Sequence, residues 1–213
     1  MTRAALARAG RVLAFALAFF AALPAGAQTT IAPKAKADPV THVYFIRGFL
    51  NVFSTGLDDM SAQLAKAGVK SVVHGHLSGS AVRAQLLADA NKAGKRPNPV
   101  VIVGHSFGAN AALSVSSLLA ADGIPVDLVI TIDPTVNGPL TANVRRYVNY
   151  HFAGNNLGVA LTSPKLGTRI TNIDMSKRKD IAGAGDDHWT VTANKALQKE
   201  ILAAIRRQVG RRQ

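Results

Sequence analysis

Two patterns of apolar residues alternate along this chain. Short runs rich in valine and isoleucine are typical of strands that a parallel sheet buries on both faces. They occupy residues 41–47, 69–75, 100–103, 126–132, 144–152 and 167–173. Apolar residues instead recur at helical spacing in residues 55–67, 80–93, 109–121 and 192–209.

Strands that alternate with helices indicate βα units, in which helices cover both faces of a parallel sheet. We therefore predict an α/β fold, a three-layer α/β/α sandwich whose mostly parallel central sheet has about six strands. It forms one domain over residues 40–213, after a polar tether at residues 28–39. The chain between Asp133 and His188 is too short for a large lid domain, so we expect an open site at the carboxyl ends of the strands.

The first 27 residues have the pattern of a secretory signal peptide. Arg3, Arg8 and Arg11 precede an apolar run at Val12–Leu23, and Ala25-Gly-Ala27 matches a small-residue cleavage site. The run is shorter than the roughly 20 residues that a membrane-spanning helix needs. We expect bacterial export, to the periplasm or outside the cell, with cleavage near Ala27.

Composition narrows the possible partners. The chain has a formal net charge of +13 and no cysteine, so its stability cannot depend on disulfides. This charge favours weak electrostatic contact with an anionic envelope surface. Because the cations are scattered and no base-reading motif or full set of metal ligands accompanies them, we expect no nucleic acid, no metal and no cofactor. We also expect a monomer.

The most informative stretch is Gly104-His-Ser-Phe-Gly108, which lies between a predicted strand and a helix rich in small residues. It fits G-x-S-x-G, in which a strained strand-to-helix turn lifts a serine hydroxyl above a parallel sheet. A Cβ atom at position 104 or 108 would collide with the neighbouring strand or helix. Ser106 is therefore a candidate nucleophile, and the plainer alternative is a glycine-rich turn without chemistry.

A serine hydroxyl needs a histidine to accept its proton and a carboxylate to orient that histidine. His188 comes shortly before the last helix, where a loop can return over Ser106, and it is the candidate base. The remaining histidines are less suitably placed: His42 begins a strand, His151 lies within one, His105 points away across the serine turn, and His74 and His76 flank a glycine.

Two aspartates compete for the orienting role. Asp133 ends the strand that follows the serine helix, whereas Asp174 ends the last predicted strand and could brace the histidine loop. The strand-end placement favours Asp133 and leaves Asp174 as the alternative acid. Asp186 and Asp187 are so close to His188 in sequence that neither is expected to reach under its ring.

An oxyanion hole needs two backbone N–H groups, one from the residue after the nucleophile and one from the loop after the first strand. Phe107 supplies the first. Phe49 is the candidate for the second because Gly48 lets the backbone leave the strand close to the site, and Leu50 is the neighbouring alternative.

Four segments together resemble an α/β-hydrolase of the small, lidless kind, similar to compact bacterial lipases and thioesterases. They are Phe45–Phe49, Gly104–Gly108, Ile132–Pro134 and Asp187–Trp189. The acid of that superfamily more often follows the next strand, but residues 150–156 offer no carboxylate. A minority, including the pancreatic-type lipases, place the acid where Asp133 stands. The resemblance implies the following roles: Ser106 as nucleophile, His188 as general base, Asp133 as orienting acid, and Phe49 with Phe107 as the oxyanion hole.

Two functions fit these residues. The first is a secreted serine hydrolase that cleaves a carboxylic ester or thioester of a small-molecule or lipid-like acyl substrate through an acyl-enzyme. The alternative is a non-catalytic cell-envelope protein that keeps the fold and binds anionic glycan or lipid. Labelling by a serine-directed fluorophosphonate distinguishes the two hypotheses.

Overall fold

The computed structural model describes residues 42–93, 98–154, 157–183 and 185–210. The predicted signal peptide and tether lie outside these residues. No helix in the described ranges is long and apolar enough to cross a membrane.

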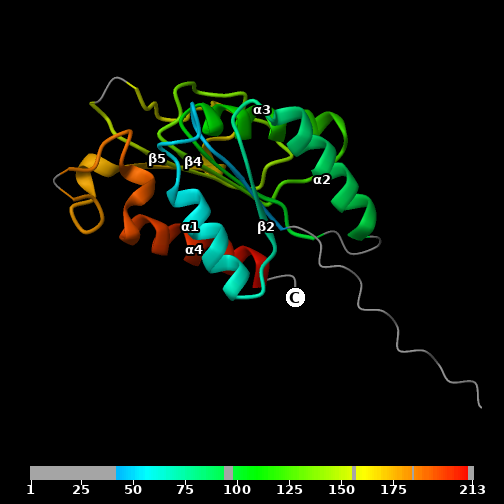
Figure 1. Ribbon diagram of the computed structural model, residues 1–213. Coiled ribbons are helices and arrows are strands. Elements are labelled where there is room, and N and C mark those ends of the chain that lie inside the picture. Colours follow the sequence, from blue (N-terminus) through cyan, green and yellow to red (C-terminus); the bar gives the residue numbers. More distant parts are fainter. Residues whose placement is uncertain (1–41, 94–97, 155–156, 184, 211–213) are drawn as a thin grey trace, which may run out of the picture. The chain divides into compact units, whose positions relative to one another are not determined.

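Six strands form one fully parallel sheet in the order β2-β1-β3-β4-β5-β6 (Figure 1). The strands are β1 (Val43–Ile46), β2 (Ser71–His74), β3 (Val101–His105), β4 (Leu128–Ile132), β5 (Tyr147–His151) and β6 (Ile170–Asp174). The chain runs outward from β1 to β2, then returns to the other side of β1 with β3. Ligands bind at the carboxyl ends of strands where the order reverses in this way, which places the expected site beyond β1 and β3.

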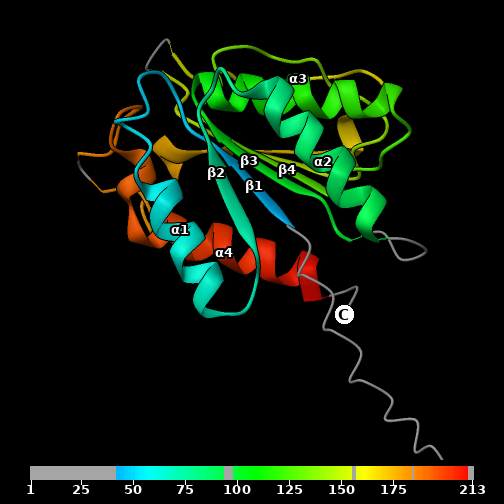
Figure 2. The same cartoon turned by 45° about the vertical axis from the view of Figure 1, so that its right-hand side comes forward.

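Helices cover both faces of the sheet, as Figure 2 shows. One face carries α2 (Gly79–Ala93) and α3 (Phe107–Ala121), and the other carries α1 (Gly56–Lys66) and α4 (Lys195–Gly210). Short 3-10 helices lie at η1 (Gly167–Arg169), η2 (Met175–Lys177) and η3 (Val191–Ala193). The predicted three-layer α/β/α sandwich is confirmed, with the predicted number of strands.

The two-residue period of a strand divides the core into two clusters. In β1, Val43 and Phe45 pack with α1 and α4, whereas Tyr44 and Ile46 pack with α2 and α3. All four side chains are buried, because the sheet is covered on both faces. This explains why the strands appear in the sequence as continuous apolar runs.

Two strands begin later in the chain than the sequence predicted. Val144 was expected in the fifth strand, but it forms only an isolated bridge with Val126 before β5 begins at Tyr147. Residues 167–169 were expected in the sixth strand, but they form the 3-10 turn η1. The carboxyl ends, where the site lies, agree within about two residues with the predicted positions.

Candidate functional site

Ser106 occupies a tight turn between β3 and α3. Its backbone has φ 56° and ψ −125°, which no regular helix or strand adopts and which a side chain rarely tolerates. A Cβ atom at Gly104 would lie 2.2 Å from the carbonyl oxygen of Gly108, and one at Gly108 would lie 2.1 Å from that of Ile46. Both glycines are therefore required by the close approach of α3 to the strands, as the sequence predicted.

Ser106, His188 and Asp133 form one connected chain of hydrogen bonds. The Nε2 atom of His188 lies 2.9 Å from the Ser106 hydroxyl oxygen, and its Nδ1 atom lies 2.7 Å from Oδ2 of Asp133. All three side chains are almost fully buried. A carboxylate only accepts hydrogen bonds, so Nδ1 carries the proton and Nε2 is left free to accept the serine proton.

Asp133 is held at the carboxyl end of β4 by its surroundings. Its backbone has φ 48°, and its N–H donates to the carbonyl of Tyr150 at 2.7 Å. Its second carboxylate oxygen, Oδ1, accepts from the N–H of Phe152 at 3.0 Å. A Cβ atom added at Gly158 would lie 1.6 Å from the same Oδ1 atom, so only glycine fits there.

Asp174, the alternative acid, has other partners. Its Oδ1 atom accepts hydrogen bonds from the backbone N–H and hydroxyl of Ser176 and from the N–H of Ala153. The Ser176 hydrogen bond is the main cause that lowers the pKa of Asp174 to about 2. Asp174 caps η2, and Asp133 is the aspartate that contacts His188.

The two candidate oxyanion donors belong to separate segments next to Ser106, and their side-chain rings are neighbours, with centroids 6.1 Å apart. Phe107 opens α3, and N–H groups in the first turn of a helix have no partner within that helix. Phe49 follows Gly48, whose added Cβ would lie 3.1 Å from the Cβ of Ser106. The loop after β1 therefore runs directly beside the serine. The oxyanion role of Phe49 and Phe107 stays a prediction.

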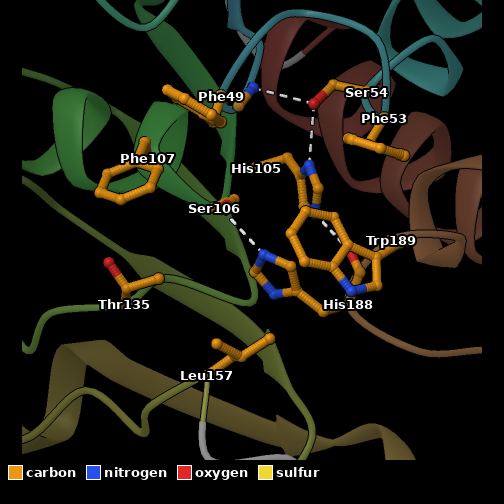
Figure 3. A pocket seen from close by; sticks show the side chains of 11 residues that line it. Phe49, Phe53, Ser54, His105, Ser106, Phe107, Thr135, Leu157, His188 and Trp189 are labelled. Carbon is orange, nitrogen blue, oxygen red and sulfur yellow. Dashed lines mark hydrogen bonds between the residues drawn. The ribbon is translucent and has the colours of Figure 1, made fainter.

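A pocket of about 280 Å³ opens over Ser106 (Figure 3). Its walls are mainly apolar: Phe49, Phe53, Phe107, Leu157 and Trp189. The Phe53 and Trp189 rings meet edge to face with centroids 4.9 Å apart, and each of the five side chains is between 39% and 50% exposed. Among the described residues that line the pocket there is no lysine, arginine, aspartate or glutamate.

Sequence reasoning missed Ser54 and gave His105 no partners, although it expected the His105 ring to point away from the serine turn. The His105 ring does not contact the Ser106 hydroxyl, but it bonds Ser54 and the backbone carbonyl of His188. Burial lowers the pKa of His105 to about 4, so its ring is neutral at pH 7. The one signal in the sequence was the polar His105 at the end of an otherwise apolar strand.

In the described residues, no group of three or more histidine, aspartate or glutamate side chains is arranged to hold a metal ion. His74 and His76, which flank Gly75, belong to no such group. The His76 ring instead packs beside the rings of Phe49 and Phe107, with centroids 5.8 and 6.1 Å away.

The parallel six-stranded sheet, its strand order and its two helical layers are those of an α/β-hydrolase fold. The chain is similar to the esterase domain of a Rhodothermus marinus protein, with 18% identity and a TM-score of 0.52 over 83% of this chain and 90% of that domain. It also aligns with a putative α/β-superfamily hydrolase from Xanthomonas campestris pv. campestris, at 18% identity and a TM-score of 0.43, over 80% of this chain and 99% of the other. No protein-family model and no curated protein matches the sequence.

Proposed function

We propose that this chain is a serine hydrolase that cleaves a carboxylic ester or thioester through an acyl-enzyme. The observation that supports this most directly is the continuous hydrogen-bonded chain from Ser106 through His188 to Asp133, at the base of an apolar pocket. The fold alone requires none of these three side chains, because α/β folds host many unrelated functions.

In the proposed first step, Nε2 of His188 takes the proton of Ser106 as the serine oxygen bonds to the acyl carbon. The carbonyl oxygen becomes an oxyanion, which accepts hydrogen bonds from the backbone N–H groups of Phe49 and Phe107. His188 then donates its proton to the leaving alcohol or thiol as the C–O or C–S bond breaks. Asp133 stabilises the positive charge that His188 carries in between.

In the second step, water replaces the leaving group. His188 takes a proton from the water as its oxygen bonds to the acyl carbon, and the proton returns to Ser106 when the acyl–enzyme bond breaks. The acid is released, and the site regains its starting protonation.

The pocket favours an uncharged, apolar acyl group. Five aromatic or aliphatic side chains line it, and burial of a substrate chain against them gains about 25 cal/mol per Å² of apolar surface. A charged acyl chain would lose hydration there without meeting a side chain of opposite charge. We therefore expect fatty-acyl-like or other neutral esters to be preferred over carboxylated ones.

The test is hydrolysis of p-nitrophenyl butyrate by the purified chain from residue 28, beside Ser106→Ala. We expect turnover in the wild type and a loss of at least about 10⁴-fold in Ser106→Ala. A butyrate analogue with a terminal carboxylate should react more slowly. Full activity in Ser106→Ala would contradict the serine mechanism, and absence of fluorophosphonate labelling in the folded wild type would favour the envelope-binding alternative.

A further inference from the structure

Gly48, Ser54 and His105 form a second line of hydrogen bonds that ends on the backbone carbonyl of His188, whose side chain belongs to the proposed catalytic chain (Figure 3). The Gly48 N–H lies 2.8 Å from the Ser54 hydroxyl oxygen, and that oxygen lies 2.8 Å from Nδ1 of His105. On the other side of the ring, Nε2 of His105 lies 2.8 Å from the backbone carbonyl oxygen of His188. Ser54 and His105 are both fully buried, with at most 1% of their surface exposed.

The partners determine the direction of every bond in this line. The His188 carbonyl can only accept, so Nε2 of His105 must carry a proton. In a neutral ring Nδ1 then carries no proton, so it accepts a hydrogen bond from the Ser54 hydroxyl. The Ser54 oxygen in turn accepts from the Gly48 N–H, which leaves the hydroxyl of Ser54 and both nitrogens of His105 paired.

This line joins three segments that are far apart in the sequence. Gly48 and Ser54 belong to the loop after β1, which carries the candidate oxyanion donor Phe49. His105 ends β3 and precedes the nucleophile Ser106. The His188 carbonyl belongs to the loop that presents the candidate base.

We propose that His105 is a positioning residue. Through its hydrogen bonds to Ser54 and to the His188 carbonyl, it holds two loops in fixed positions relative to Ser106: the loop after β1, which carries Phe49, and the loop that carries His188. This inference rests on the proposed serine-hydrolase function. His105 touches no reacting atom and acts by holding two backbone segments. A shift of about 1 Å in either segment is enough to reduce a catalytic rate by roughly 100-fold.

Two substitutions at His105 separate its two contacts. His105→Asn places an amide oxygen near the position of Nδ1 and keeps the Ser54 contact, but it is too short to reach the His188 carbonyl. His105→Gln places an amide N–H near the position of Nε2 and keeps the His188 contact, but it loses the acceptor for Ser54. Ser54→Ala removes the hydroxyl that links Gly48 to His105. The matched control is His42→Gln, because His42 lies at the opposite end of β1 from the site.

The first readout is steady-state kinetics on p-nitrophenyl butyrate. We expect kcat to fall by about 10-fold or more in His105→Asn, His105→Gln and Ser54→Ala, with KM within about threefold of wild type. His42→Gln should keep the wild-type kcat. A kcat within twofold of wild type in folded His105→Asn and Ser54→Ala would overturn the proposal.

The second readout is independent of activity. Nitrogen NMR of histidine-labelled protein should show His105 neutral with its proton on Nε2, and the ring signals of His188 should shift in His105→Asn but not in His42→Gln. A proton on Nδ1 of His105, or unchanged His188 signals in both His105→Asn and Ser54→Ala, would overturn the positioning role. If the wild type hydrolyses no ester, the proposed function fails, and these signals still decide whether His105 couples the loops.

Discussion

Asp133 and His188 are 55 residues apart in the sequence, yet Oδ2 of one lies 2.7 Å from Nδ1 of the other. Both side chains are buried, and the remaining carboxylate oxygen accepts from the backbone N–H of Phe152. The pair therefore fixes the His188 ring from behind while its Nε2 atom faces Ser106. This contact also separates the two aspartates that the sequence left in competition.

Asp133→Asn should reduce kcat by roughly 10³- to 10⁴-fold, because an amide N–H in place of Oδ2 would disfavour the His188 tautomer that accepts the serine proton. Asp174→Asn is the matched control and should stay within about threefold of wild type, since Asp174 contacts Ser176 and Ala153 instead. Steady-state ester hydrolysis measures both. Equal losses in the two variants would contradict the assignment of Asp133.

Gly158→Ala should disturb the site through Asp133 without changing any catalytic group. The added Cβ would lie 1.6 Å from Oδ1 of Asp133, so the carboxylate or the loop must move. We expect kcat to fall by about 100-fold or more, and thermal unfolding to show a loss of roughly 1–3 kcal/mol. Gly154→Ala lies in the same loop with open space at its Cβ position, and it should keep both activity and stability.

Trp189→Ala should weaken binding of apolar acyl chains more than it slows chemistry. Trp189 lines the pocket and packs edge to face on Phe53, so its loss removes apolar contact surface from the substrate. We expect KM for a p-nitrophenyl octanoate to rise several-fold, with little change for the acetate. Leu118→Ala, an equally exposed apolar residue on α3 outside the pocket, serves as the control, and a comparable rise there would argue against a specific acyl wall.

Buried His105 should make the folded state less stable in acid. Burial lowers its pKa from 6.5 to about 4, so between these values the unfolded chain binds a proton that the folded chain does not. The free energy of unfolding therefore falls as the pH drops from 6.5 to 4, and this one residue accounts for roughly 3 kcal/mol of that fall. Burial also lowers the pKa values of His42 and His74, so they add to the slope.

Denaturant unfolding at several pH values isolates the His105 contribution. His105→Gln cannot titrate, so its free energy of unfolding should depend less steeply on pH in this window than that of the wild type. His42→Gln keeps His105 and should therefore retain most of the pH dependence of the wild type. Identical pH dependence in wild type and His105→Gln would contradict the lowered pKa.

Local chemistry accounts for the parts of this protein that its sequence predicts. Continuous apolar runs specify strands buried on both faces, and helical spacing between them specifies βα units, so the layered sheet follows from residues close together in the chain. Gly104 and Gly108 likewise indicate the serine turn, because a strained backbone and a close helix need glycine at fixed offsets from Ser106.

Contacts between distant segments depend on how the loops fold back over the sheet edge. Sequence order could not decide whether Asp133 or Asp174 orients the histidine, because both lie at the carboxyl ends of parallel strands. Only the packing of the loops brings Asp133 into contact with His188. The sequence did not indicate what Ser54, His105 and Gly158 do, since each acts through a hydrogen bond or steric contact to a residue at least 25 positions away: Ser54 with His105, His105 with His188, and Gly158 with Asp133. Local periodicity therefore specifies the layers, while the line from Gly48 to His188 exists only once the loop after β1, the end of β3 and the His188 loop meet.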